Sequence, residues 1–314
     1  MQVLNMWACE GVATVMIGEG LGMLSDNPSD MAKSFLSASL AFIRSLTNFL
    51  YAPPLYKIHH SLSQPYQIFD KAVKEVYSVG AAILTQKIKQ IESGKNVEDV
   101  GFLGKWVLDG EMTDREILPI VSDFLAVGID TTSVTTTFLL HELSKNPEVQ
   151  ERLRSEVISV FGNHDEVTDP MQAKLPYLKN CVKETLRLYP AGPIMRAMPE
   201  DVVLCGYKVP AGTLVSVQPY TLGRDPNNFS DPLTFNPDRW DKESKEHHHP
   251  FAYLPFGYGP RACYGRRLAE MEITSLLVKL MQNFRLSSEQ KTLKIINKTT
   301  LQPAHPVQMK FEKL

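Results

Sequence analysis

Cysteine is scarce in this chain of 314 residues, and its scarcity excludes two kinds of protein. Only Cys9, Cys181, Cys205 and Cys263 are present, and no two of them form a CxxC pair. Four such thiols in so long a chain indicate neither a disulfide framework nor a zinc site built from cysteines. A reducing compartment is therefore the expected environment.

A strong net charge and a targeting segment are also lacking. The formal net charge is -2, which gives no overall attraction to nucleic acid, so an electrostatic partner must use a local patch. No apolar run approaches the ~18 residues that span a bilayer. Residues 1–20 lack the charged and apolar regions of a signal peptide and resemble the middle of a buried helix instead.

Apolar residues at three- and four-residue spacing dominate the first half of the chain. We expect helices over 29–50, 66–92, 113–145, 147–161, 176–188 and 266–284. Residues 113–116 have the form of a capping box, and residues 96–110 read as a polar bridge that contains glycine. Residues 202–217 and the last thirty predict short strands, and 219–262 predict irregular backbone. The fold class is therefore mainly α with small β-sheets.

The connector at residues 49–56 is apolar and broken by two prolines. One interpretation is a loop that packs on the core. The other is a hydrophobic lip that touches a membrane, since contiguous exposed apolar residues mark interaction surfaces.

Residues 256–265, which read FGYGPRACYG, are the segment best suited to hold a metal. Two glycines let the backbone approach a flat, bulky group, and Pro260 stiffens the loop. Cys263 precedes a helical segment, so its thiolate is expected at the positive end of a helix dipole. A cysteine thiolate can hold haem iron, and Arg261 is placed to reach a propionate.

Two other interpretations of this loop exist. A single cysteine is more often a buried core thiol than a ligand. Residues 257–262 also fit the loose dinucleotide pattern GxGxxA. That pattern requires a strand of a βαβ unit before it, and Pro260 removes a backbone donor that phosphates would need. We therefore reject the dinucleotide interpretation.

Two charged motifs bear on the same site. Glu184 and Arg187 stand at i and i+3 on one predicted helix face, which allows an ion pair. The alternative is an ordinary surface pair, which is common and weak. Arg239, within FNPDRW at 235–240, lies in the irregular segment and could reach the same carboxylate.

The segment AVGIDTT at 126–132 falls midway along the long predicted helix, although Gly, Asp and Thr are poor helix formers. Such a conflict with propensity is expected at a functional site. Asp130 is either a solvated helix position or a buried acid, and the apolar residues before it favour the buried acid. A threonine hydroxyl that bonds back to a carbonyl can open a helix locally.

In order and spacing, these four motifs resemble the cytochrome P450 family, with its patterns (A/G)GxDTT, ExxR, FxPxRW and FGxGxRxCxG. The resemblance covers almost the whole chain and implies haem b and monooxygenase activity. It implies the following roles: Cys263 as iron ligand; Glu184, Arg187 and Arg239 as a structural triad; Arg261 and Arg196 as propionate partners; Phe256 as the aromatic beside the thiolate; Asp130 and Thr131 as proton guides. It also implies that Gly128 leaves room for dioxygen.

The pattern LKxxxKETLRLYP with a CxGRR loop resembles the mitochondrial class of the family. That class implies a ferredoxin-type electron donor with its NADPH-dependent reductase, and a peripheral place on the inner membrane. Docking would use Lys179, Lys183, Arg266 and Arg267, although a merely solvated helix face is the alternative. The apolar segments 124–126, 191–195 and 300–301 resemble substrate contacts and imply a lipophilic substrate such as a sterol, steroid or secosteroid.

The resemblance runs from about the family's E-helix to its C-terminus, as a single partial domain over 1–314. The N-terminal third of the usual chain, with its transit peptide and one basic propionate partner, is missing from the pattern. An active monooxygenase therefore competes with a catalytically silent fragment that binds haem poorly or not at all, and with a haem-thiolate isomerase. We expect the chain alone to be unstable, because the missing third would cover apolar surface.

Overall fold

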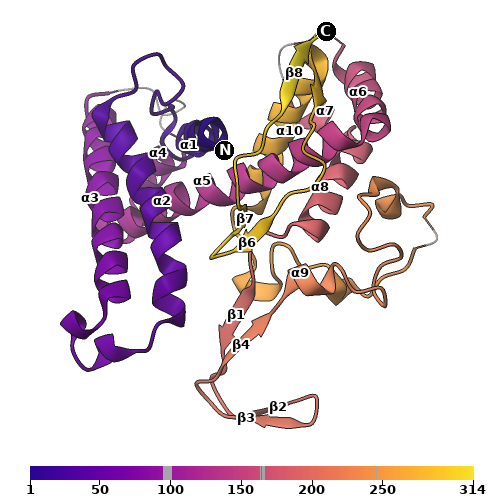
Figure 1. Ribbon diagram of the computed structural model, residues 1–314. Coiled ribbons are helices and arrows are strands. Elements are labelled where there is room, and N and C mark those ends of the chain that lie inside the picture. The colour runs from indigo at the N-terminus through magenta and orange to yellow at the C-terminus, as the bar shows by residue number, and fades with distance from the viewer. Residues whose placement is uncertain (95–100, 163, 165–166, 245) are drawn as a thin grey trace. The chain divides into compact units, whose positions relative to one another are not determined.

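The computed structural model describes residues 1–94, 101–162, 164, 167–244 and 246–314 (Figure 1). They form two compact units. The first comprises 1–137, 267–273 and 298–307, and the second comprises 138–266, 274–297 and 308–314. The prediction of a single domain over 1–314 stays a prediction.

The first unit is helical. Its elements are α1 (Gln2–Ile17), α2 (Asp30–Tyr51), the 3-10 turns η1 (Leu55–Lys57) and η2 (His60–Leu62), α3 (Gln64–Glu92), α4 (Gly101–Asp109), most of α5 (Asp114–Lys145), part of α10 (Arg266–Asn283) and the strand β7 (Leu301–Pro303). Helices α2 and α3 pack along each other (Figure 1). The core draws on α1 to α5 through buried residues such as Val12, Phe35, Ile83, Leu103 and Ile129.

Local chemistry explains where these helices begin. Ser29 caps α2, because its side chain accepts from the Ala32 N–H at 3.2 Å. At the start of α5, the Glu116 carboxylate accepts from the Thr113 N–H at 2.9 Å, which confirms one half of the predicted capping box. The other half differs, because the Thr113 hydroxyl donates to the Glu116 carboxylate at 2.8 Å instead of accepting from the Glu116 N–H. This hydrogen bonding lowers the pKa of Glu116.

One predicted connection is wrong in part. Residues 101–109 form α4, with Leu103 fully buried, whereas the sequence suggested a polar bridge; residues 95–100 lie outside the described residues. The glycines of this segment suggested a connection without a helix, but Gly101 is the first residue of α4 and Gly110 directly follows it, both at positive φ. Leu103 and Val107 are four residues apart, so they lie on the same face of α4, and this face packs on the core.

The second unit holds the end of α5, then α6 (Pro147–Phe161), α7 (Asp169–Gln172), α8 (Pro176–Leu188), α9 (Pro219–Leu222) and the rest of α10. Its strands are β1 (Ile194–Ala197), β2 (Val202–Leu204), β3 (Tyr207–Val209), β4 (Leu214–Val217), β5 (Phe284–Ser287), β6 (Ile295–Asn297) and β8 (Lys310–Lys313). The antiparallel pairs are β1–β4, β2–β3 and β5–β8. The segment 219–262 is largely irregular, with short turns η4 (Pro237–Trp240), η5 (Pro250–Ala252) and η6 (Gly259–Arg261).

Helix α5 corrects the expectation about apolar runs. By length and composition alone, its residues Arg115–Lys145 would suffice to cross a membrane. However, 56% of its most apolar window is buried inside the protein. This burial is typical of a central core helix.

Candidate haem-thiolate site

The loop around Cys263 is shaped by two glycines and one backbone hydrogen bond. Gly257 and Gly259 have φ of 74° and 69°, a region that favours glycine over other residues. The Cys263 N–H donates to the Phe256 carbonyl at 2.8 Å, and this bond closes the loop. Helix α10 begins at Arg266, three residues later, so the thiol lies near the N-terminal end of a helix as predicted.

The structure also decides between two interpretations of the thiol. Cys263 is exposed in this chain, so it is not a buried core thiol. Cys9 and Cys181 are the buried ones, and burial raises the pKa of Cys9 to about 12 and that of Cys181 well above its usual value. The predicted neighbour of the thiolate, Phe256, has the Arg266 guanidinium over its ring at 5.3 Å.

Glu184 is the centre of a buried network rather than half of a surface pair. The fractional exposures of Glu184, Arg187 and Arg239 are 0%, 2% and 3%. Arg187 donates from Nε and Nη2 to the two Glu184 oxygens at 2.9 and 2.8 Å, and Arg239 Nε donates to Oε1 at 2.9 Å. The three residues of the predicted triad are therefore brought together.

Two further donors complete the shell of Glu184, and sequence reasoning assigned them no role. The Trp240 indole N–H donates to Oε2 at 2.9 Å, and the Asn236 backbone N–H donates to Oε1 at 2.8 Å. A third addition is Glu246, which accepts from Arg239 Nη1 at 2.6 Å. The available signal was the indole of Trp240, because a buried Trp N–H needs an acceptor.

The network also reaches toward the cysteine loop. The Trp240 ring lies 4.5 Å, centroid to centroid, from the ring of Tyr253, and Tyr253 stands three residues before Phe256. The opposite end of the network is held by backbone carbonyls, since Arg187 donates to Pro232 and Thr234 at 2.6 and 3.0 Å. A rigid, charged core thus supports the segment that leads into the loop.

Two arginines meet beside the loop. Arg196 on β1 donates from Nη2 to the Arg261 carbonyl at 3.2 Å, and both side chains are exposed. Over the ranges that the structure describes, neither guanidinium forms an ion pair with a carboxylate. Exposed guanidiniums without such a partner, one of them bonded to the backbone of the other residue, suit a carboxylate ligand such as a propionate.

Asp130 is a buried acid and not a solvated helix position. Only 1% of the residue is exposed, and Thr300 Oγ1 donates to its Oδ2 at 2.6 Å. Its neighbour Thr131 bonds back to the Val127 carbonyl at 3.0 Å, as the sequence suggested, although α5 continues without a break. Thr300 was expected to contact substrate, but its hydroxyl is engaged with the acid.

Gly128 has a packing role that the sequence did not indicate. A side chain built at Gly128 would come within 2.8 Å of Val12 Cγ2 on α1. The glycine therefore lets α1 and α5 approach closely. That it leaves room for dioxygen stays a prediction.

The four basic residues predicted to dock a partner differ in their surroundings. Lys179, Arg266 and Arg267 are exposed, whereas Lys183 is half-buried, with its ammonium 5.8 Å from the centre of the Trp240 ring. Lys179 and Lys183 both lie on α8, four residues apart. Arg266 also serves the loop itself through its contact with Phe256.

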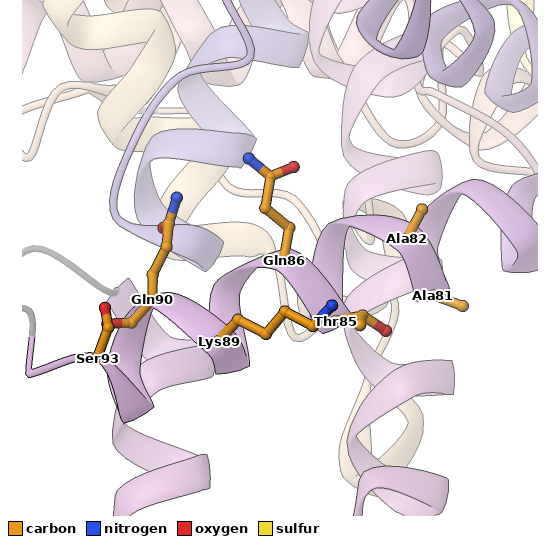
Figure 2. A pocket seen from close by; sticks show the side chains of 7 residues that line it. All are labelled: Ala81, Ala82, Thr85, Gln86, Lys89, Gln90 and Ser93. Carbon is orange, nitrogen blue, oxygen red and sulfur yellow. The ribbon is translucent and has the colours of Figure 1, made fainter.

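An open groove on α3 contains none of these motifs. Figure 2 shows its lining: Ala81, Ala82, Thr85, Gln86, Lys89, Gln90 and Ser93. Six of these residues lie on α3 and Ser93 directly follows it, and none of the seven is a thiol, histidine or carboxylate. The groove therefore adds nothing to the catalytic constellation.

Comparison with known proteins decides what these motifs belong to. The sequence profile of the family described as Cytochrome P450 matches residues 1–311. The chain belongs to the cytochrome P450 family. Its fold agrees: the crystal structure of the cytochrome P450DA heme domain matches with a TM-score of 0.82 and 22% identity, over 100% of this chain and 67% of that one.

Curated relatives in the cytochrome P450 family include mitochondrial enzymes. The chain is 33% identical over 310 residues to the mitochondrial cholesterol side-chain cleavage enzyme of Hypanus americanus, across 97% of this chain and 59% of that protein. It is 32% identical over 324 residues to the human mitochondrial sterol 26-hydroxylase, across 99% and 60%. The chain thus spans about 60% of the length of these relatives.

Proposed function

We propose that this chain belongs to a haem-dependent monooxygenase that uses dioxygen to hydroxylate a lipophilic substrate of the sterol, steroid or secosteroid class. The observation that carries the proposal is the exposed Cys263 thiol, held near the N-terminal end of α10 on a loop closed by the Phe256–Cys263 backbone bond. Membership of the family and the mitochondrial steroid and sterol enzymes among its relatives support it.

The residues fit haem b by the chemistry of their donors. Cys263 would hold the iron, and the unpaired guanidiniums of Arg196 and Arg261 would bind propionates. When bound, haem supplies the site of dioxygen activation, and a thiolate ligand donates electron density that favours O–O cleavage. The Glu184 network would keep the loop in place by holding Trp240, which contacts Tyr253.

Oxygen activation consumes protons, and the buried Asp130 with Thr131 is our candidate to deliver them. A positioned acid and alcohol can pass protons while the apolar core excludes bulk water. An isomerase that does not use dioxygen needs no such pair. The buried acid beside Thr131 therefore favours the monooxygenase.

The test is a carbon monoxide difference spectrum of the reduced chain after haem reconstitution. We expect a thiolate-type Soret band that is lost in Cys263→Ser and retained in Cys205→Ser, the matched exposed cysteine. A band that survives Cys263→Ser removes the ligand assignment. Failure of the wild-type chain to take up haem, with uptake restored by a longer N-terminus, supports the silent-fragment alternative.

We further propose that a ferredoxin, re-reduced by its NADPH-dependent reductase, supplies electrons and that Lys179, Lys183, Arg266 and Arg267 dock it. Lys179 is the sharper probe, because Lys183 also lies over Trp240. We expect Lys179→Glu to slow reduction by ferredoxin about tenfold at low salt and less at high salt. Lys291→Glu makes the same charge change at an exposed position and should leave the rate unchanged. Equal rates for both variants contradict docking through Lys179.

Peripheral contact with the mitochondrial inner membrane is the last part of the proposal. The connector at residues 49–56 combines packed and exposed side chains. Phe49 stacks on Phe69 with 4.7 Å between ring centres, as in a loop that packs on the core. Tyr51, and Ile58 just after the connector, are 68% and 77% exposed, as a lip that touches a membrane would be. Exposed apolar side chains around a packed aromatic centre suit insertion at a lipid surface. Ile58→Glu should weaken binding to cardiolipin-containing vesicles, whereas Val203→Glu, at a 71% exposed position, should not. Equal binding by both variants contradicts the contact.

A further inference from the structure

The carboxylate of Asp130 is held by two side chains from the C-terminal part of the first unit. Thr300 Oγ1 donates to Oδ2 at 2.6 Å. Gln302 Nε2 donates to Oδ2 and Oδ1 at 3.3 and 3.4 Å, and to Thr300 Oγ1 at 3.0 Å. All three residues are more than nine-tenths buried, with exposures of 1%, 4% and 7% for Asp130, Thr300 and Gln302.

This arrangement fixes the acid from one side. Thr300 donates its only hydroxyl proton to the Asp130 carboxylate. The Gln302 amide in turn donates a hydrogen bond to the Thr300 hydroxyl oxygen. A carboxylate that accepts both donors has little rotational freedom. In a buried site, such a satisfied polar network also rigidifies the residues that compose it.

The segment that bears Thr300 is itself anchored. Its neighbour Thr299 donates to the Ile43 carbonyl on α2 at 2.8 Å and is hydrogen-bonded to Thr47. Adjacent threonines thus tie one segment to α2 and to α5. Thr300 is therefore a fixed support for Asp130 rather than a mobile one.

We propose that Thr300 and Gln302 are positioning residues that orient Asp130 for proton delivery. The role rests on the proposed monooxygenase function. Proton transfer demands a defined donor geometry, and an acid released from its supports loses that geometry. With haem bound and Asp130 out of position, dioxygen that has taken up two electrons from the ferredoxin and two protons would be released as hydrogen peroxide instead of being inserted into substrate.

The first experiment needs no haem. Urea denaturation of the wild-type chain and of Thr300→Val, Asp130→Asn and the double variant forms a thermodynamic cycle. We expect Thr300→Val to lower the midpoint, and to lower it less when Asp130 is already Asn. Independent, additive midpoint shifts would show that the two side chains are uncoupled and would overturn the proposal.

The second experiment uses the haem-loaded protein with ferredoxin, its reductase, NADPH and cholesterol as the probe substrate. We expect the peroxide released per NADPH to rise severalfold in Thr300→Val, toward the value of Asp130→Asn, and to fall back in Thr300→Ser, which keeps the hydroxyl. Thr136→Val is the matched control, since Thr136 is a buried threonine whose hydroxyl donates to the Thr132 carbonyl at 2.8 Å and not to Asp130. It should match the wild type.

The outcomes separate the two proposals. Unchanged peroxide release in Thr300→Val, with elevated release in Asp130→Asn, overturns the positioning role and leaves the monooxygenase intact. If the wild-type chain takes up no haem, the proposed function fails and the role in proton delivery fails with it. Coupling in urea would in that case identify the network as structural only.

Discussion

Arg187 and Glu184 form a two-pronged ion pair at zero side-chain exposure, with Nη2–Oε1 and Nε–Oε2 distances of 2.8 and 2.9 Å. A buried charge pair is stable only when its remaining lone pairs and protons are also satisfied. Here Arg239, Trp240 and Asn236 satisfy the carboxylate. The pair is therefore one part of a closed network.

Removing the Glu184 carboxylate should strongly destabilise the chain. Glu184→Ala leaves two arginines buried without their anion, and breaking a buried pair in this way costs about 3–5 kcal/mol. The free energy of unfolding, from urea denaturation, measures it. Glu75→Ala is the control, because its partner Lys71 is 3.8 Å away and both are largely exposed, so about 1 kcal/mol or less is expected. Similar losses for both variants would contradict a buried network.

Thiol chemistry should divide the four cysteines into two pairs. Cys205 and Cys263 are exposed, whereas burial raises the pKa of Cys9 and Cys181 and keeps their reactive thiolates scarce. Ellman's reagent should modify two thiols rapidly in the native haem-free chain and all four in urea. Haem binding should then protect one of the two. Rapid modification of all four without denaturant would show that the core is open.

Much of the site was predictable because its functional residues belong to short sequence motifs. The spacing of Glu184 and Arg187 places both on one helix face, and Arg239 follows from the FNPDRW segment. The outer shell was not predictable in this way. Trp240 and Asn236 reach Glu184 only because the irregular segment folds back on α8, which is a tertiary event.

The same limit applies to Asp130. Its apolar sequence context indicated burial, but its partners Thr300 and Gln302 lie 170 and 172 positions away. Thr300 and Gln302 are two residues apart at a strand, so their side chains are expected on the same face of it. The local sequence does not indicate that this face contacts Asp130. The error at α4 has another cause: glycines at 101, 104 and 110 outweighed the helical spacing of the apolar residues.

Glu272 should make stability depend on pH. It is 8% exposed, both of its carboxyl oxygens lack a hydrogen-bond partner among the residues described, and burial raises its pKa from 4.5 to about 8. A raised folded pKa means that the stabilising contribution is complete below pH 4.5 and is lost as pH rises through about 8. At 1.36 kcal/mol per pKa step, the loss is at most on the order of 5 kcal/mol.

Glu272→Gln isolates this contribution, because the amide has the shape of the protonated acid and does not ionise. We expect the variant to gain stability relative to the wild type steadily between pH 5 and pH 8 in urea denaturation. Glu289→Gln, at an exposed position, is the control and should show no such trend. A constant difference between Glu272→Gln and the wild type across this range would show that Glu272 is ionised in the fold.

The close approach of Val12 to Gly128 should limit the size of the side chain that position 128 on α5 tolerates. A methyl group at position 128 would meet Val12 Cγ2 at 2.8 Å, so Gly128→Ala should destabilise the chain by about 1–3 kcal/mol through overpacking. Val12→Ala in the same chain should recover part of that loss, because it removes the methyl group that collides. Val127→Ala changes the neighbouring, 38% exposed position and should have little effect. Urea denaturation of the single and double variants gives the coupling between positions 12 and 128. If Gly128→Ala is as stable as the wild type, or if its loss is unaffected by Val12→Ala, close packing of α1 on α5 is not the reason for the glycine.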